Sequence, residues 1–111
     1  AAETFRNTDL SQKLARHHRD AEKTFWGWHD IWNSAEFRDW NIEPYVGSIH
    51  VPILAIQGEQ DEYGSAAQIQ AITNARRGST DAHLLTNCGH TPHRDQSQAT
   101  LALMRSFIEA L

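Results

Sequence analysis

The sequence is poor in several features that mark particular classes of protein. It has a single cysteine, Cys88, which excludes an intrachain disulfide and fits a reducing, cytoplasmic compartment. No apolar run approaches the roughly 20 residues that a membrane span needs. Ten Lys and Arg stand against fourteen Asp and Glu, a formal net charge of −4, whereas nucleic-acid binding needs a clustered excess of positive side chains. We therefore expect neither a membrane nor a nucleic-acid partner.

The overall composition is that of a folded domain. The 111 residues are 40% hydrophobic and 22% charged, within the globular range. The composition changes near residue 50, and residues 1–46 are polar, rich in His and contain all four Trp. Their spacing predicts three helices with side-chain caps at Thr8, Asp20 and Ser34. We therefore expect residues 1–46 to form a helical segment distinct from residues 47–111.

A strand–helix–strand–helix pattern follows the break that Pro44 and Gly47 mark. The apolar run 51–58 is typical of a parallel strand that is covered on both faces. Residues 65–78 predict a helix, and residues 81–87 predict a second strand. Because a helix joins the two strands, we expect a right-handed β-α-β unit and an α/β fold.

Local signals define both helices of this half. The signals at the ends of the helix over 65–78 are a capping box of Ser65 and Gln68 and a basic C-terminus of Arg76 and Arg77 before Gly78. From about residue 96 onward the spacing predicts an amphipathic last helix. Its predicted apolar face consists of Leu101, Met104, Ile108 and Leu111, widened by Leu103 and Phe107.

Two chemically active side chains follow the predicted strands at matching distances. Asp61 lies four residues after Gln57, and His90 lies four residues after Thr86. The C-terminal ends of parallel strands meet at one edge of a sheet, where α/β proteins build their sites. We therefore expect this carboxylate and this imidazole to stand side by side on neighbouring loops.

The segments that carry these two residues resemble a known family. "VPILAIQGEQDEYG" and "LLTNCGHTPHRDQ" resemble the C-terminal portion of the α/β-hydrolase superfamily. In that fold a Gly-x-x-Asp loop supplies the acid of a catalytic triad, and a Gly-His loop after the last strand supplies the base; here these loops are 58–61 and 89–90. The resemblance implies that residues 1–46 belong to a helical cap, or lid, and that residues 47–111 are the C-terminal β-α-β-α part of the hydrolase core.

The resemblance also implies a mechanism, from which one part is missing. A nucleophile attacks a carbonyl, His90 takes its proton, and Asp61 orients and stabilises the imidazole. The Gly-x-Ser-x-Gly elbow that carries the nucleophile occurs nowhere in the sequence. We therefore expect the chain to be a fragment of an esterase-like or C–C bond hydrolase that acts on a small-molecule substrate without a cofactor. The fragment alone is expected to show no hydrolytic turnover.

Other chemistry in the same loop has weaker support. His90 and His93 have a His-x-x-His spacing, but Pro92 argues against a helix and zinc sites use three or four ligands, so we expect no metal. Cys88 lies two residues from His90 in a tight loop, which gives it no base in a proton-accepting orientation, so we expect it to be buried packing. Asp95 is a candidate cap for the last helix.

The aromatic residues near the N-terminus allow two interpretations. Trp28 and Trp32 lie on one predicted helix face with Phe25, where they either pack or line a substrate pocket. An alternative function is a non-catalytic interaction domain that binds a partner through these helices, and a third is a small metal-binding module. A two-stranded parallel sheet leaves edges and apolar faces uncovered. We therefore expect the chain to self-associate or to pair with the missing half of the hydrolase.

Overall fold

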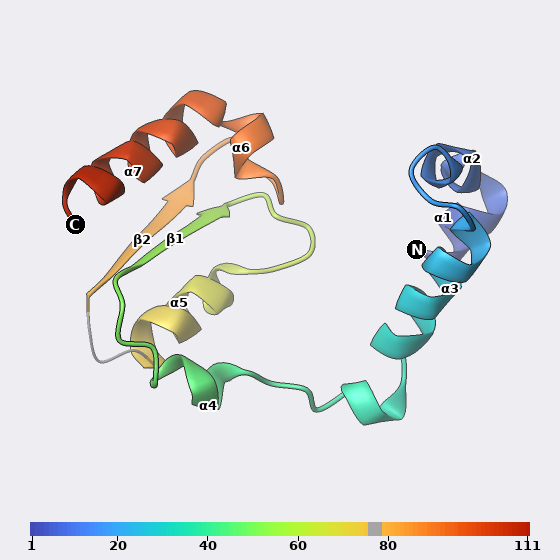
Figure 1. Cartoon of the computed structure of the whole chain (residues 1–111), viewed down its shortest axis with the longest axis horizontal. Helices are drawn as coiled ribbons and strands as arrows, with labels where there is room; N and C mark the ends of the chain where they lie inside the picture. The colour runs from blue at the N-terminus through green and yellow to red at the C-terminus, as the bar shows by residue number, and fades with distance from the viewer. Residues whose placement is uncertain (76–78) are drawn as a thin grey trace. The chain divides into compact units, whose positions relative to one another are not determined.

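The computed structural model describes residues 1–75 and 79–111, so the predicted helix end at Arg76, Arg77 and Gly78 lies outside the described residues. The chain forms two compact units, residues 1–41 and residues 42–111. Figure 1 shows that the first unit is helical and that the second combines helices with a small sheet. None of the helices in the described ranges is long and apolar enough to cross a membrane.

Residues 1–41 contain three α-helices and one 3-10 turn. These are α1 (Ala2–Asn7), α2 (Leu10–Ala15), α3 (Ala21–Trp32) and η1 (Ala35–Phe37). The predicted caps at Asp20 and Ser34 are confirmed, because their side-chain oxygens accept from the backbone N–H of Lys23 at 3.1 Å and of Phe37 at 3.3 Å. The residue before α2 is Asp9, whose side chain makes no capping hydrogen bond. The Thr8 hydroxyl accepts from the backbone N–H of Leu10 at 3.2 Å, so the cap predicted at Thr8 is confirmed.

Helix α1 was not predicted, and a long-range contact explains why it is stable. Its only large apolar side chain, Phe5, is 4% exposed. Phe5 stacks on Phe25 of α3 with ring centroids 4.1 Å apart, and Trp26 meets both rings edge-on. A helix of six residues has too few hydrogen bonds to persist by itself, so the contact with α3 stabilises it.

Residues 42–111 form a small α/β unit. Its elements are α4 (Glu43–Val46), β1 (Ile53–Gly58), α5 (Ala66–Ala75), β2 (Thr80–Leu85), α6 (Pro92–Asp95) and α7 (Ser97–Glu109). The strands β1 and β2 are parallel, in a register that pairs Ile53 with Thr80 and Gly58 with Leu85. Helices α5 and α7 lie on opposite sides of the two strands (Figure 1). The predicted α/β class and the parallel pairing are confirmed.

Two prolines that were read as helix breakers instead begin short helices. Pro44 lies in the first turn of α4, and Pro92 is the first residue of α6. Proline is tolerated there because the first N–H groups of a helix have no intrahelical partner. The two prolines therefore begin helices rather than interrupt them. The predicted break lies just before α4, between residues 41 and 42, and His90 precedes α6, so it shares no helix with His93.

The apolar stripe predicted for α7 is present, but most of it is not covered. Four residues of this stripe have exposed fractions between 44% and 73%: Leu101, Met104, Ile108 and Leu111. The buried side instead contains Thr100, which is 5% exposed and donates its hydroxyl hydrogen bond to the carbonyl of Pro92 at 3.0 Å. Leu103 and Phe107 share this side, at i+3 and i+7, and are half-buried. The contact with α6 therefore sets the rotation of α7, and an apolar stripe is left uncovered.

Candidate active site

The loops that follow β1 and β2 are joined by their backbones. The N–H of Glu59 donates to the carbonyl of Leu85, and the N–H of Gln60 donates to that of Cys88, both at 2.8 Å. The approach is so close that a side chain at Gly58 would collide with the carbonyl oxygens of the second loop. Only glycine fits at this position. The backbones of the two loops are therefore in direct contact at this edge of the sheet.

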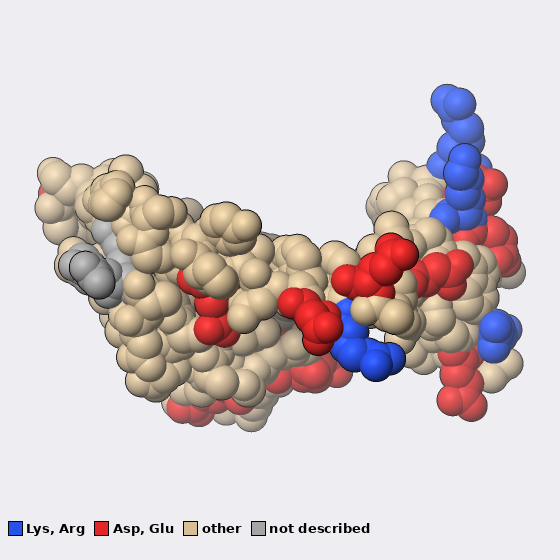
Figure 2. Space-filling view, turned by 90° about the horizontal axis from the view of Figure 1, so that it is seen from below, with Lys and Arg blue, Asp and Glu red and all other residues tan. Residues whose placement is uncertain are grey.

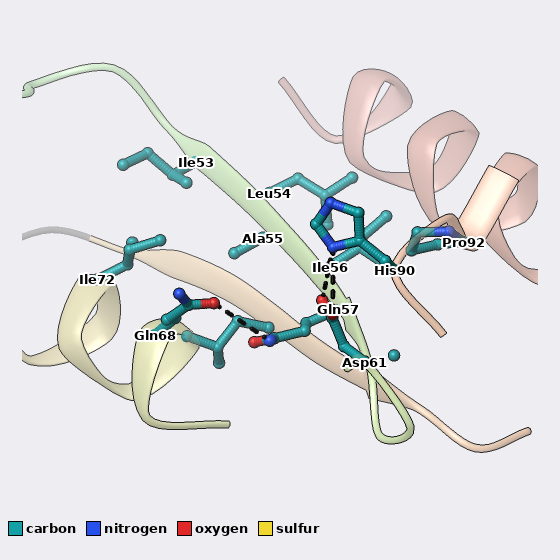
Figure 3. A pocket seen from close by; sticks show the side chains of 12 residues that line it. Ile53, Leu54, Ala55, Ile56, Gln57, Asp61, Gln68, Ile72, His90 and Pro92 are labelled. Atoms are coloured by element: carbon teal, nitrogen blue, oxygen red, sulfur yellow. Dashed lines mark hydrogen bonds and ion pairs between the residues drawn. The ribbon is translucent and has the colours of Figure 1, made fainter. Parts of the chain in front are cut away.

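The candidate acid and base meet at this edge. Nδ1 of His90 lies 3.0 Å from Oδ2 and 3.1 Å from Oδ1 of Asp61 (Figure 3). The predicted proximity of the two side chains is confirmed. The Asp61 side chain is 8% exposed and that of His90 is 61% exposed, so the carboxylate is covered while the imidazole remains accessible. Nε2 of His90 has no hydrogen-bond partner within residues 1–75 and 79–111.

The surroundings of Asp61 favour its ionised form. The hydrogen bond with His90 is the largest influence that lowers the pKa of Asp61 below its usual value, followed by the backbone N–H of Tyr63, which donates to Oδ1 at 2.8 Å. Burial opposes this effect, and the amide of Gln57 adds a smaller contribution that lowers the pKa. An ionised carboxylate favours the tautomer in which Nδ1 of His90 carries the proton. This leaves the other ring nitrogen as a proton acceptor.

Residues after the histidine fix the shape of its loop. The prediction that Asp95 caps α7 is wrong, because the residue before α7 is Gln96. Oδ2 of Asp95 instead accepts from the backbone N–H of Gly89 at 2.9 Å, directly beside His90. The side chain of Gln96 donates to the carbonyls of Thr86 and Asn87 at 3.2 and 3.1 Å. These contacts connect α6 and the start of α7 to the loop that carries the imidazole.

Cys88 has the packing role that was predicted for it. The residue is 1% exposed. Burial raises the pKa of its thiol, and the nearby carboxylates of Asp95 and Asp61 raise the pKa further. A thiol held in its protonated form is a poor nucleophile.

A pocket of about 410 Å³ runs along β1 and reaches Asp61 and His90 (Figure 3). Side chains from both faces of β1 line it, so it follows the edge of β1 that no strand covers in the described part of the chain. The remaining lining residues come from α5 and the histidine loop: Gln68, Ile69, Ile72 and Pro92. The pocket is mainly apolar, with its polar groups at the C-terminal end of the strand.

The sequence did not single out two residues that surround the pair, and it indicated a different role for a third. Gln57 and Tyr63 act on the carboxylate of Asp61, and the ring of Tyr63 packs edge-on to His90 with centroids 5.0 Å apart. Asp95 was noticed, but for a different role. A signal existed for Gln57, because it is the only polar residue in the run from Val51 to Gln57, and buried polar groups require partners.

The other predicted site residues lie apart from this pair in the chain. Trp28 and Trp32 belong to the unit of residues 1–41 and are 52% and 54% exposed. Trp28 is tilted against Phe25, and Trp32 meets Phe37 edge-on. Substrate binding by these two tryptophans stays a prediction.

One face of the α/β unit carries acidic and uncharged side chains. Over residues 42–111, the face seen in Figure 2 shows Asp and Glu among uncharged side chains, and the Lys and Arg in view lie over residues 1–41. Among the described residues, no group of three or more His, Cys, Asp or Glu side chains is placed to hold a metal ion. His93 is exposed on α6.

Comparison with known proteins assigns no family. No protein-family model matches the chain, and no curated protein or solved structure matches it. What the Asp61–His90 pair does is therefore inferred from its geometry and chemistry.

Proposed function

We propose that this chain supplies the acid and the base of a nucleophile–His–Asp triad in an α/β-hydrolase. The observation that carries the proposal is the contact of Nδ1 of His90 with both carboxylate oxygens of Asp61, at 3.0 and 3.1 Å. This contact joins loops at the C-terminal ends of two parallel strands, the edge where α/β folds build their sites. The order of the residues in the chain, acid before histidine, is that of the fold.

Each residue has a role in this proposal that follows from its surroundings. Asp61 stays ionised and holds the Nδ1–H tautomer of His90, so that Nε2 is free to accept a proton from a nucleophile. The imidazolium that forms is stabilised by the carboxylate, and its proton then passes to the leaving group. The exposure of His90, 61% of its side chain, leaves room for the nucleophile to approach Nε2.

The nucleophile has to come from residues outside this sequence, because the 111 residues contain no Gly-x-Ser-x-Gly elbow. In the proposed full enzyme the elbow and the oxyanion hole belong to the half of the fold that adjoins the free edge of β1. The substrate class that suits this machinery is a small molecule with an ester or an activated C–C bond next to a carbonyl. Alone, the chain is expected to hydrolyse no ester faster than an equal concentration of free imidazole.

The decisive experiment extends the chain with the segment that precedes it in its reading frame and measures hydrolysis of p-nitrophenyl esters. In an active extended protein, His90→Ala and Asp61→Asn should each lower kcat/KM by about 1,000- to 10,000-fold, as expected for loss of a triad member. Asp81→Asn is the matched control. Asp81 also contacts a histidine, His83 at 2.7 Å, but along strand β2. Retention of activity in His90→Ala, or a preceding segment without a strand–elbow–helix unit, would refute the proposal.

A second candidate function rests on a different observation. The side chains of Trp28, Ile31 and Trp32 on α3 are all more than half exposed, and exposed apolar groups on one helix are typical of a binding surface. We propose as the alternative that this surface binds a protein partner and that the α/β unit serves as a scaffold. A chain that lacks hydrolytic activity in its extended form, and that loses binding to a partner in a Trp28→Ala/Trp32→Ala variant, would favour this alternative.

A further inference from the structure

Gln57 is a buried polar side chain in a place that the strand pattern reserves for apolar residues. Side chains alternate along a strand, so Gln57 shares one face of β1 with Ile53 and Ala55. Gln57 is 7% exposed, and that face of β1 is covered by α5 (Figure 3). Burial of an amide is unfavourable unless the amide is hydrogen-bonded. The contacts of the Gln57 side chain therefore indicate its structural role.

The Gln57 amide lies between helix α5 and the acid loop. Its Nε2 donates to Oε1 of Gln68 on α5 at 3.4 Å (Figure 3). The Gln57 amide also makes a small contribution to the lowered pKa of Asp61. Gly64, in the loop after Asp61, is so near that a Cβ there would lie 3.1 Å from Nε2 of Gln57. The amide is therefore packed against the loop that carries the acid.

The orientation of this amide follows from its partner. If the amide were turned over, its oxygen would face Oε1 of Gln68, acceptor against acceptor. The donating side therefore points to Gln68. Oε1 of Gln57 is then left buried without a hydrogen-bond partner in the described part of the chain. An unpaired buried acceptor is unfavourable, so the arrangement is one that packing alone would not select.

We propose that Gln57 is a positioning residue for the acid–base pair: together with Gln68 it holds helix α5 against the loop that carries Asp61 and so keeps both oxygens of that carboxylate within reach of Nδ1 of His90. This inference rests on the proposed function of the pair. Oδ1 of Asp61 already accepts from the N–H of Tyr63. Packing of the Gln57–Gln68 pair against Gly64 of the same loop adds a second fixed point and restricts movement of the carboxylate out of the plane in which it meets the imidazole.

The experiment measures the tautomer of His90 and the titration of Asp61 by NMR in the complete chain. Gln57→Met keeps the length of the side chain and removes its donor. We expect it to lower the ratio of the Nδ1–H to the Nε2–H tautomer of His90 by about twofold or more, the effect of one lost hydrogen bond. We also expect it to raise the pKa of Asp61 towards its usual value. Gln98→Met, an exposed glutamine on α7, is the control and should change neither quantity.

A second variant covers the case in which Gln57→Met does not fold. Gln68→Met changes an exposed side chain, leaves Gln57 in place and removes the acceptor that orients its amide, so it should shift both quantities in the same direction by a smaller amount. Unchanged tautomer ratios and an unchanged Asp61 titration in a folded variant would overturn the inference.

The His90 tautomer of the unsubstituted chain distinguishes failure of this inference from failure of the proposed function. If His90 of the unsubstituted chain shows no preference for the Nδ1–H tautomer, the acid–base pair itself is refuted. If that preference is present in the parent and survives in Gln57→Met and Gln68→Met, only the role of Gln57 is refuted.

Discussion

Replacing Gly58 with alanine tests whether the two catalytic loops depend on close backbone contact. Gly58 ends β1, and the added methyl group would collide with the carbonyl oxygens of Cys88 and Gly89. Both neighbours are backbone atoms, so no side chain can rotate out of the way. The loop that carries His90 has to move instead.

The size of the effect follows from the distances. Relief of the collision needs a shift of about 1 Å or more, because non-bonded heavy atoms pack at roughly 3.5–4.0 Å. A shift of that size separates Asp61 from His90, which are 3.0 Å apart, beyond the range of a hydrogen bond. Overpacking of this kind costs about 1–3 kcal/mol. The reduced freedom of alanine in the unfolded chain offsets about 0.4–1 kcal/mol of this.

The assay is urea unfolding of the complete chain, combined with NMR of the His90 imidazole. Gly58→Ala should unfold at a lower urea concentration and lose the Nδ1–H···carboxylate hydrogen bond. Gly27→Ala is the matched control. A Cβ at Gly27 meets no atom within 4 Å, and Gly27 lies inside α3, so this change should stabilise by about 0.4–1 kcal/mol. A Gly58→Ala protein as stable as its parent, with an intact hydrogen bond, would refute the reasoning.

The remaining predictions concern the same unit. Asp95→Ala should lower the free energy of unfolding by about 1 kcal/mol, measured by urea unfolding, because the N–H of Gly89 loses its acceptor; Asp95→Asn keeps an acceptor and should lower it less. The pKa of Asp61 is lower in the folded state than its usual value of 3.8. The ionised carboxylate should therefore contribute its full stabilisation above pH 3.8, and this stabilisation should disappear as the pH falls through the folded pKa. Acid unfolding of Asp61→Asn should lack this pH-dependent loss of stability. Cys88 should react with a thiol reagent at pH 8 only after urea is added, and fast reaction of the folded chain would contradict its burial. The chain should self-associate in sedimentation experiments, and Leu101→Lys, on the exposed stripe of α7, should reduce association; a monodisperse parent monomer with cooperative unfolding would argue against this.

The sequence predicted the site better than it predicted the surroundings of the site. The contact between Asp61 and His90 was predictable because it depends on two general properties, the parallel direction of β1 and β2 and the position of loops at strand ends. The contacts that neighbouring residues make with the pair and its loops were not predictable. That Gln57 acts on Asp61, or that Asp95 binds the N–H of Gly89 instead of capping α7, depends on side-chain directions that spacing does not define.

The errors in the fold have a common physical origin. The spacing of α7 supports two apolar stripes, and only the hydrogen bond from Thr100 to the carbonyl of Pro92 selects the one that packs inward. Likewise, α1 depends on the stacking of Phe5 on Phe25. Local patterns identify which segments can form helices, whereas contacts between distant segments decide which helices persist and how they are rotated.

The hydrogen bond of the acid–base pair spans 29 positions of the chain, and this separation governs when the pair exists at all. Neither loop holds its partner until the whole crossover between the strands has closed, and closing a long loop precedes any gain from the contact that it permits. Local opening of β2 would therefore break the contact between Asp61 and His90. The helices of residues 1–41 have their own aromatic contacts and would keep their circular dichroism signal. On heating, the NMR signal of the His90 imidazole should show loss of the pair at a lower temperature than the circular dichroism signal shows loss of helix.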